Sequence, residues 1–428
     1  MIGVLLLKSL IDYMMSRKIT FCAYDKPDSI GGPVTWLMHL LPYLKQTGFE
    51  VSCLIFFHEG NTGPLYEHLV KNDITVHTSS FLSSTEDNIK WILDCLQKNT
   101  PHIFVPNLVV PAYFACKWVK KAGIKTIGIS HSDDPFYHAI QKEFIDGHKS
   151  FRLDGMICVS KELEKQLQKS NYASKVKIKR IPCGVIIPDS KAKRDDTSLR
   201  VIYVGRLAEQ QKRISEVARS FCEMTQKISG VEAIIYGDGP DKIKVENILN
   251  DQQITTAVSL GGNIHPDQMI DKLLKAHVIV LLSDYEGLPV SILEAMACGV
   301  VPVCIDMRSG ITELIENGKT GYIVDDRNEH FIKTIKKLKA DNQIWEQMSL
   351  NAKQLVTGNF SLEISCNSYS SFFNNLKVNT VKKVRIPSRL RLPKINQDLS
   401  RADTRKPKFN FTQLKLTLGR FKHKLFYR

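Results

Sequence analysis

Short apolar runs alternate along the chain with stretches in which apolar residues recur at helical spacing. In the stretch 34–45, Trp36, Leu40 and Leu44 share one face, which predicts an amphipathic helix. The predicted strands are 18–23, 48–55, 103–105, 126–129, 155–159, 200–204, 232–236, 258–260, 278–282 and 301–304. Strands that alternate with helices at this spacing form a parallel sheet with helices on both faces, so the pattern predicts an α/β fold.

A polar stretch, 188–198, interrupts the alternation, which then restarts. We interpret it as a linker between two doubly wound domains, 19–187 and 199–360. Residues 361–379 are predicted to form a C-terminal helix that returns to the first domain, and 380–428 a separate tail. In open α/β sheets ligands bind beyond the carboxyl ends of the strands, and the candidate residues below follow predicted strands.

Two carboxylates eight positions apart are the most informative feature of the sequence. Glu286 follows a buried strand and lies in a loop, whereas Glu294 lies about one turn into the next helix. Pro289 suits the first position of that helix, where a missing N–H costs nothing. The free N–H groups of a helix start bind anions, so this segment predicts a pocket for a phosphorylated, hydroxyl-rich ligand.

The segment 285–297 resembles the Glu-x7-Glu motif of the retaining GT-B glycosyltransferases of the large group 1 family, family 4. The resemblance continues through 299–303, 310–315 and 317–322 and covers residues 19–360. It implies two Rossmann-like domains with a nucleotide-sugar cleft between them. It also implies transfer of a sugar, of the hexosyltransferase type, from a nucleotide-diphosphate donor to an acceptor hydroxyl with retention of anomeric configuration.

Two cations follow the first strand of the second domain. Gly205 and Arg206 come directly after that strand, and Lys212 follows six residues later. Permanent cations in such a loop suit a diphosphate. The resemblance assigns all three residues to the donor pyrophosphate.

The resemblance assigns the remaining site residues as well. Glu286 would approach the donor sugar and stabilise positive charge at its anomeric carbon, and His131 would contact the sugar and phosphate, so these two are the catalytic candidates. Glu294 would bind the ribose hydroxyls. The other donor-binding candidates are Gly31, Gly32, Gly237, Gly239, Ile264, Gly287 and Leu288.

No metal or other cofactor is expected, because Arg206 and Lys212 would neutralise the diphosphate. Asp133 and Asp134 could suggest the metal-binding acid pair of another glycosyltransferase fold, but that fold lacks the two-domain motif set, so we interpret them as loop residues. The ten cysteines show no Cys-x-x-Cys pair, which favours reduced, buried thiols in a cytoplasmic protein.

Positive charge is concentrated at the C-terminus. Residues 380–428 hold fifteen Lys and Arg and two Asp, so they carry +13 of the formal net charge of +15. Phe411, Leu414, Leu418, Phe421 and Leu425 recur at helical spacing there. A basic amphipathic helix fits peripheral attachment to an anionic membrane on its inner face. A solvated tail and a helix packed on its own domain are the alternatives, and no nucleic-acid motif accompanies the charge.

The beginning of the chain and the function both leave alternatives open. Residues 1–18 are predicted as a leader helix or as an upstream start to a chain that begins at Met14 or Met15. The acceptor is expected to be a cell-surface glycan or a lipid-linked sugar. The alternatives in function are a nucleotide-sugar epimerase of the same fold and a catalytically inactive, membrane-associated scaffold that binds a nucleotide sugar.

Overall fold

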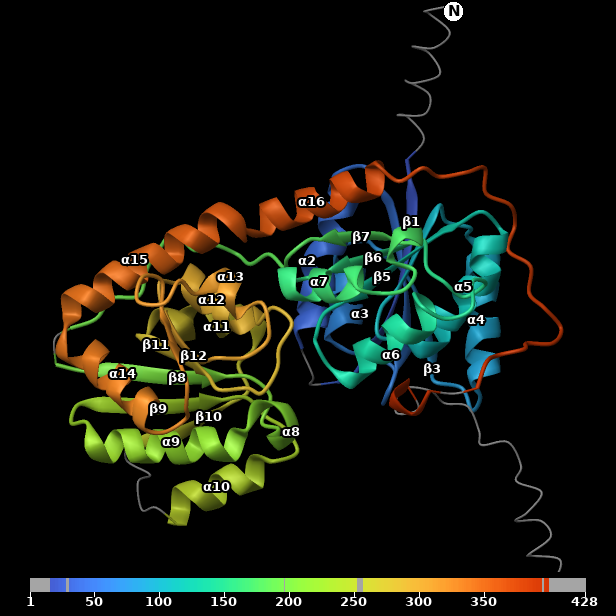
Figure 1. Cartoon of the computed structure of the whole chain (residues 1–428). Coiled ribbons are helices and arrows are strands. Elements are labelled where there is room, and N and C mark those ends of the chain that lie inside the picture. The colour runs from blue at the N-terminus through green and yellow to red at the C-terminus, as the bar shows by residue number, and fades with distance from the viewer. Residues whose placement is uncertain (1–15, 28–30, 196, 252–256, 395, 400–428) are drawn as a thin grey trace, which may run out of the picture.

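The structure, a computed structural model, describes residues 16–27, 31–195, 197–251, 257–394 and 396–399. Most of the predicted leader, 1–18, therefore lies outside the described residues. The apolar stripe between Phe411 and Leu425 lies wholly outside them. The described residues form two α/β domains that lie side by side (Figure 1).

The N-terminal domain contains a seven-stranded parallel sheet in the order β3-β2-β1-β4-β5-β6-β7. Its elements are β1 (Lys18–Asp25), α2 (Gly32–Gln46), β2 (Glu50–Phe57), α3 (Pro64–Lys71), β3 (Thr75–Ser80), α4 (Thr85–Lys98), β4 (Ile103–Pro106), α5 (Val110–Lys121), β5 (Lys125–Ser130), α6 (Pro135–Phe144), β6 (Gly155–Cys158), α7 (Lys161–Gln168), η1 (Ala173–Lys175) and β7 (Lys177–Arg180). The strand order reverses between β1 and β4, which makes that point the expected ligand side.

The C-terminal domain repeats the design with six parallel strands in the order β10-β9-β8-β11-β12-β13. Its elements are β8 (Leu199–Val204), α8 (Glu209–Lys212), α9 (Ile214–Lys227), β9 (Val231–Tyr236), α10 (Lys242–Asp251), β10 (Val258–Gly262), α11 (Pro266–Leu274), β11 (Val278–Leu281), α12 (Val290–Ala297), β12 (Val301–Ile305), α13 (Ile311–Leu314), β13 (Tyr322–Val324), α14 (Glu329–Ala340) and α15 (Asn342–Asn359). Its order reverses between β8 and β11. The two sheets confirm the predicted doubly wound α/β fold.

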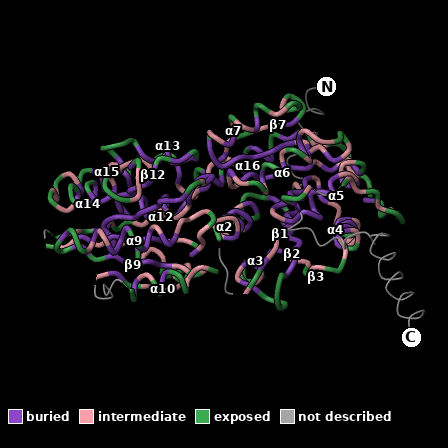
Figure 2. The backbone as a smooth tube through the Cα atoms, turned by 60° about the horizontal axis from the view of Figure 1, so that its bottom comes forward, coloured by how far each residue is buried: buried purple, intermediate pink, exposed green. Residues whose placement is uncertain are grey.

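Three strands, β3, β7 and β13, were not predicted, and each lies at an edge of its sheet. Edge strands are solvated on one side, so their side chains need not be apolar. In β7, for example, exposed Lys177 and Lys179 alternate with half-buried Ile178 and Arg180. The central strands are buried along most of their length, and Figure 2 shows buried backbone running through the middle of both domains.

Helix α16 (Leu362–Asn374) carries the chain back onto the N-terminal domain (Figure 1). The Tyr43 hydroxyl donates a hydrogen bond of 2.8 Å to Asn367 Oδ1. The rings of Phe21 and Phe373 meet edge to face with centroids 6.2 Å apart. Because Phe21 lies on β1, α16 completes the core of the first domain rather than that of the second.

The chain then continues as an extended segment along the N-terminal domain, which we call the C-terminal strap and define as residues 377–394 and 396–399, with η2 (Gln397–Leu399) at its end. Val384 and Leu399 are fully buried. The basic tail predicted from 380 onward therefore begins with a segment that packs on the domain surface. None of the helices in the described ranges has the length and apolar content needed to cross a bilayer.

Candidate functional site

The carboxyl edges of the two sheets face each other at close range. Gly32 begins α2 in the first domain, and a Cβ atom at Gly32 would lie 3.5 Å from Cγ2 of Val290, which begins α12 in the second. Gly31 is the N-cap of α2. Two helix N-termini therefore approach one another between the domains, and their free N–H groups and dipoles favour an anionic ligand there.

Gly287 is a point of close contact between the domains. A Cβ atom at this position would lie only 1.9 Å from the carbonyl oxygen of His131, so no side chain fits there. Gly287 also accepts a hydrogen bond of 2.7 Å from the Gly310 N–H, and Leu288 beside it is buried. These contacts hold the loop that carries Glu286 against the end of β5.

Glu286 forms a buried ion pair with Lys212. Lys212 Nζ lies 2.5 Å from Glu286 Oε1, and the two side chains are only 15% and 9% exposed. Gln211 Nε2 donates to the Tyr285 carbonyl at 3.0 Å and lies 3.4 Å from Glu286 Oε2. The pair brings together α8, which follows β8, and the loop after β11. Strands β8 and β11 are neighbours at the switch point of the sheet.

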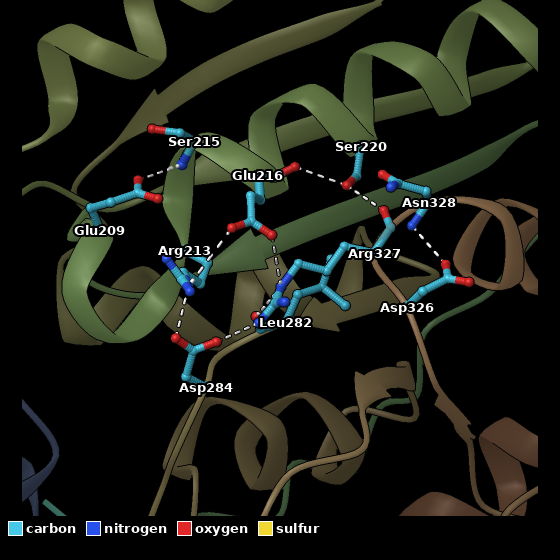
Figure 3. Close-up of polar contacts among 10 residues, drawn as sticks. All are labelled: Glu209, Arg213, Ser215, Glu216, Ser220, Leu282, Asp284, Asp326, Arg327 and Asn328. Carbon is cyan, nitrogen blue, oxygen red and sulfur yellow. Dashed lines mark hydrogen bonds and ion pairs between the residues drawn. The ribbon is translucent and has the colours of Figure 1, made fainter.

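A second ionic network involves the residues next to this pair in the sequence, and Figure 3 shows it. Asp284, two residues before Glu286, binds Arg213 Nε at 2.7 Å and Arg327 Nη2 at 2.6 Å. Arg213 follows Lys212 and has the left-handed backbone angle φ 52°. Arg327 also donates from Nε to the Leu282 carbonyl at 3.0 Å. The network therefore joins the segment that follows α8 to the loop that precedes Glu286.

Arg206 is placed differently from Lys212. Its side chain is exposed, and the Tyr203 hydroxyl donates to its carbonyl oxygen at 2.9 Å. Tyr24 lies near the end of β1 in the opposite domain, and burial raises the pKa of its hydroxyl. The positive charge of Arg206 partly opposes that rise. The Arg206 guanidinium therefore lies close enough to the first domain to act on Tyr24. The structure thus separates the two cations: Arg206 faces the first domain from the surface, whereas Lys212 is engaged by Glu286.

The predicted donor-binding glycines Gly237 and Gly239 allow the loops after β8 and β9 to pack closely together. Gly237 has φ 131°, and a Cβ atom there would lie 1.9 Å from the Gly205 carbonyl oxygen. A Cβ atom at Gly239 would lie 2.3 Å from the carbonyl oxygen of Leu207. Ile264, after β10, is half-buried against the core. These candidates line the carboxyl ends of β8, β9 and β10.

His131 follows β5 and faces the first domain's own interior. Its Nε2 lies 2.9 Å from Asn107 Oδ1, and its ring meets that of Trp36 edge to face at 5.1 Å. Burial lowers the pKa of His131 to about 3, so the imidazole is neutral at pH 7. Asn107, which follows β4, was not among the predicted site residues, because nothing in its local sequence indicates that it meets His131.

Glu294 lies in the second turn of α12 and is half-buried. Burial is the one cause acting on its carboxyl group within the described residues, and it raises the pKa from 4.5 to about 7. A carboxyl group that loses solvation on burial and gains no compensating partner is typical of a ligand-binding position.

Replacing Glu294 with Gln should therefore stabilise the unliganded protein in a pH-dependent way. Between pH 4.5 and about 7 the folded state binds more protons at Glu294 than the unfolded state, so the native protein loses stability as pH rises through that window. The variant is expected to match the wild type at pH 4.5 and to exceed it by roughly 1–3 kcal/mol at pH 8, measured by urea denaturation. Exposed Glu329 provides the control, and Glu329→Gln should show no such trend; equal trends in both variants would contradict the assignment.

Two buried carboxylates join the domains and were not predicted as site residues. Asp133 is held by Arg308 of the second domain at 2.8 Å, by His138 at 2.6 Å and by Gln166 at 3.0 Å. Burial raises the pKa of Asp133, but these hydrogen bonds and the Arg308 charge outweigh it, so the net shift is downward. Asp133 is thus an interdomain contact rather than a simple loop residue.

The second carboxylate is Glu313, which lies on α13 and reaches into the first domain. It accepts a hydrogen bond of 2.5 Å from the Lys161 N–H at the start of α7 and pairs with Arg180. Asp134 caps α6 by accepting from the Tyr137 N–H at 3.0 Å. Within the described ranges, no group of three or more His, Cys, Asp or Glu residues is arranged to hold a metal ion.

Known proteins resemble the chain both in sequence and in fold. Alpha-D-kanosaminyltransferase of Streptomyces kanamyceticus is 27% identical over 177 residues, which are 41% of this chain and 45% of that protein. N-acetyl-alpha-D-glucosaminyl L-malate synthase of Bacillus anthracis is 29% identical over 165 residues, 38% of this chain and 42% of that protein. The matched segments thus span less than half of these relatives' own length.

The solved structure of Anabaena Alr3699/HepE in complex with UDP covers 84% of this chain and 100% of its own, with a TM-score of 0.66 at 16% identity. This likeness confirms the predicted GT-B fold. Residues 30–187 match the model "Glycosyltransferase Family 4", and residues 188–355 match "Glycosyl transferases group 1". The chain therefore combines a glycosyltransferase family 4 domain with a glycosyl transferases group 1 domain on a GT-B fold.

Proposed function

We propose that the protein is a glycosyltransferase that moves a hexosyl group from a nucleotide-diphosphate sugar to an acceptor hydroxyl with retention at the anomeric carbon. The observation that carries the proposal is the interdomain arrangement of charged and hydrogen-bonding groups. The Lys212–Glu286 pair, the N-terminus of α12 and the exposed Arg206 lie on one side, and the N-terminus of α2 and His131 lie on the other. The two alternatives, an epimerase and an inactive scaffold, are not favoured by the domain matches.

The charges suggest how such a reaction would proceed. As the bond between the anomeric carbon and the phosphate oxygen breaks, negative charge grows on the diphosphate, and Arg206, Lys212 and the helix N-terminus would stabilise it. Positive charge grows on the sugar, and the Glu286 carboxylate would stabilise that. The acceptor oxygen then attacks the same face, and its proton passes to the departing phosphate oxygen. His131, neutral at pH 7, would donate or accept a hydrogen bond rather than supply charge.

We further propose UDP as the first nucleotide to test, because Anabaena Alr3699/HepE was solved in complex with UDP. The acceptor is proposed to be a glycan or a lipid-linked sugar, and the place of action the cytoplasmic face of a membrane. The basic segment 380–428 supports this placement.

Direct binding measurements and a transfer assay test the proposal together. UDP and GDP should be titrated into the protein by calorimetry, and UDP- and GDP-sugars then incubated with glycan and lipid acceptors, with and without EDTA. We expect one nucleotide to bind and transfer or slow donor hydrolysis to persist in EDTA. Absence of nucleotide binding would overturn the proposal, and complete dependence on a divalent metal would contradict its electrostatic part.

Arg206→Ala is expected to weaken binding of the nucleotide diphosphate by roughly 1.5–3 kcal/mol, the typical worth of a charge-assisted hydrogen bond. The guanidinium is exposed, so its loss should leave the fold intact. Arg219→Ala, which removes an exposed guanidinium from α9, is the matched control and should bind as the wild type does. Equal affinity in all three proteins would remove Arg206 from the site.

A further inference from the structure

The C-terminal strap is held in place by its backbone and its apolar side chains. The Lys382 N–H donates to the carbonyl of Ala122 at 2.8 Å, and Gln97 Nε2 donates to the carbonyl of Val384 at 2.6 Å. Val384 is fully buried. The strap thus runs from the end of α16 past α5 and α4, and η2 at its end packs on α6 (Figure 1).

The cations of the strap are all exposed at the protein surface. Between residues 377 and 394 there are seven cations and no Asp or Glu, and each cation is exposed. They are Lys377, Lys382, Lys383, Arg385, Arg389, Arg391 and Lys394. No ion pair joins any of them to a carboxylate of a described residue, whereas most basic clusters on a protein surface are interspersed with acids.

Helix α5 adds positive charge to the same surface. Lys117 Nζ lies 3.5 Å from the carbonyl oxygen of Arg391. Burial lowers the pKa of Lys117, and the neighbouring charges of Lys121 and Arg391 lower it further. Like charges are thus held together by packing, at an electrostatic cost that an anionic partner would relieve.

Apolar side chains lie beside the cations. Ile386 of the strap and Leu82 are 37% and 39% exposed, and with Trp91 they line a hollow of about 580 Å³. The two carboxylates in this hollow, Asp87 and Asp94, are paired with lysines of α4 at 3.8 Å and 2.7 Å. The surface therefore offers unpaired cations together with exposed apolar groups.

We infer that the C-terminal strap and α5 form a preorganised docking surface for an anionic lipid bilayer. Cations on a rigid ridge would contact lipid headgroups, and the neighbouring apolar side chains would enter the interface. A soluble polyanion would satisfy the charges alone and leave Ile386 and Leu82 without a role. The inference deepens the proposed function in one respect: η2 ends beside α6, which follows the His131 loop, so docking would bring the edge of the first domain that carries the site towards the membrane.

The test compares two triple variants of the full chain on vesicles. K383Q/R385Q/R389Q removes three exposed strap cations, and R219Q/K333Q/K336Q removes three exposed cations from α9 and α14 as a matched control. Binding to vesicles of phosphatidylcholine with phosphatidylglycerol is measured by sedimentation at low salt. Each cation near an anionic surface is worth roughly a fivefold change in binding, so the strap variant should bind roughly 100-fold more weakly and the control less than twofold.

Residues 400–428 are present in every protein compared, so the difference reports the strap alone. Wild-type binding to anionic vesicles equal to that on pure phosphatidylcholine would overturn the inference, and so would equal binding by the two variants. Binding of soluble polyphosphate without binding to anionic vesicles would do the same and would indicate a polyanionic partner instead. UDP affinity, measured in parallel, should be unchanged in both variants; if the wild type binds no nucleotide, the proposed function fails while the vesicle result stands on its own.

Discussion

Glu286→Gln is expected to lower the rate of sugar transfer by about 10²–10³-fold while the affinity for the nucleotide diphosphate changes by less than about threefold. The carboxylate is buried and pairs with Lys212 at 2.5 Å. An amide of the same shape keeps a hydrogen-bond acceptor for Lys212 but removes the negative charge that would face the anomeric carbon as positive charge grows there. The effect should therefore fall on kcat rather than on binding.

The measurement is single-turnover transfer, with calorimetric titration of UDP alongside it. Glu316→Gln, at an exposed site where the carboxylate pairs with Lys319, is the control and should retain the full rate. A variant of Glu286 that transfers sugar within threefold of the wild type would show that the carboxylate is a structural partner of Lys212 and nothing more. Loss of nucleotide binding in that variant would instead indicate that the pair shapes the phosphate site.

Asp284→Asn is expected to lower the free energy of unfolding by about 1–3 kcal/mol and the rate of transfer by tenfold or more. Asp284 joins Arg213 and Arg327 at 2.7 Å and 2.6 Å, so its neutralisation leaves the two guanidinium groups with only the longer ionic contacts to Glu216, at 3.7 Å and 3.4 Å, among the described residues. The expected loss of stability is below the range for a fully buried pair, because Asp284 is 35% exposed and solvent screens part of the interaction. The rate falls because the segments that carry Lys212 and Glu286 are then less firmly joined to each other.

Guanidinium chloride denaturation and the transfer assay measure the two effects separately. Asp267→Asn changes a carboxylate that is 90% exposed and should alter neither quantity. Unfolding midpoints that agree between the Asp284 variant and the wild type would mean that the network in Figure 3 adds no stability. A normal transfer rate would mean that it does not position the Lys212–Glu286 pair.

The fold could be predicted from the sequence because central strands in a doubly wound sheet are apolar on both faces. The run 278–282 is an example, and the structure places β11 there, at Val278–Leu281. The edge strands β3, β7 and β13 could not be predicted in this way. The C-terminal strap escaped prediction for a related reason: its few apolar residues, such as Val384 and Leu390, are separated by cations, and such a composition is also typical of a solvated linker.

The site was partly predictable for a different reason. In a parallel sheet, residues that follow the strands lie at the same edge. The contact between Lys212 and Glu286 agrees with this, because β8 and β11 are neighbours in the sheet. Contacts between the domains have no such local signal. Asp133 binds Arg308, which lies 175 residues away in the sequence. This contact forms because one domain packs on the other.

The return of the chain at α16 has a consequence for biogenesis. Arg17, which directly precedes β1, donates hydrogen bonds to the carbonyls of Phe373 and Leu376, and Trp36 packs on Tyr369 with ring centroids 5.5 Å apart. A ribosome therefore has to synthesise the whole second domain before the first can close its core. The chain emerges from the ribosome N-terminus first, so Trp36 and Phe21 of the first domain stay without their α16 contacts until α16 has been made. The second domain, 199–360, is one contiguous segment and can complete its folding before that. The order of completion is thus the reverse of the order of synthesis, and a chain that is cut short before Phe373 leaves its earliest-made domain as the unfinished one.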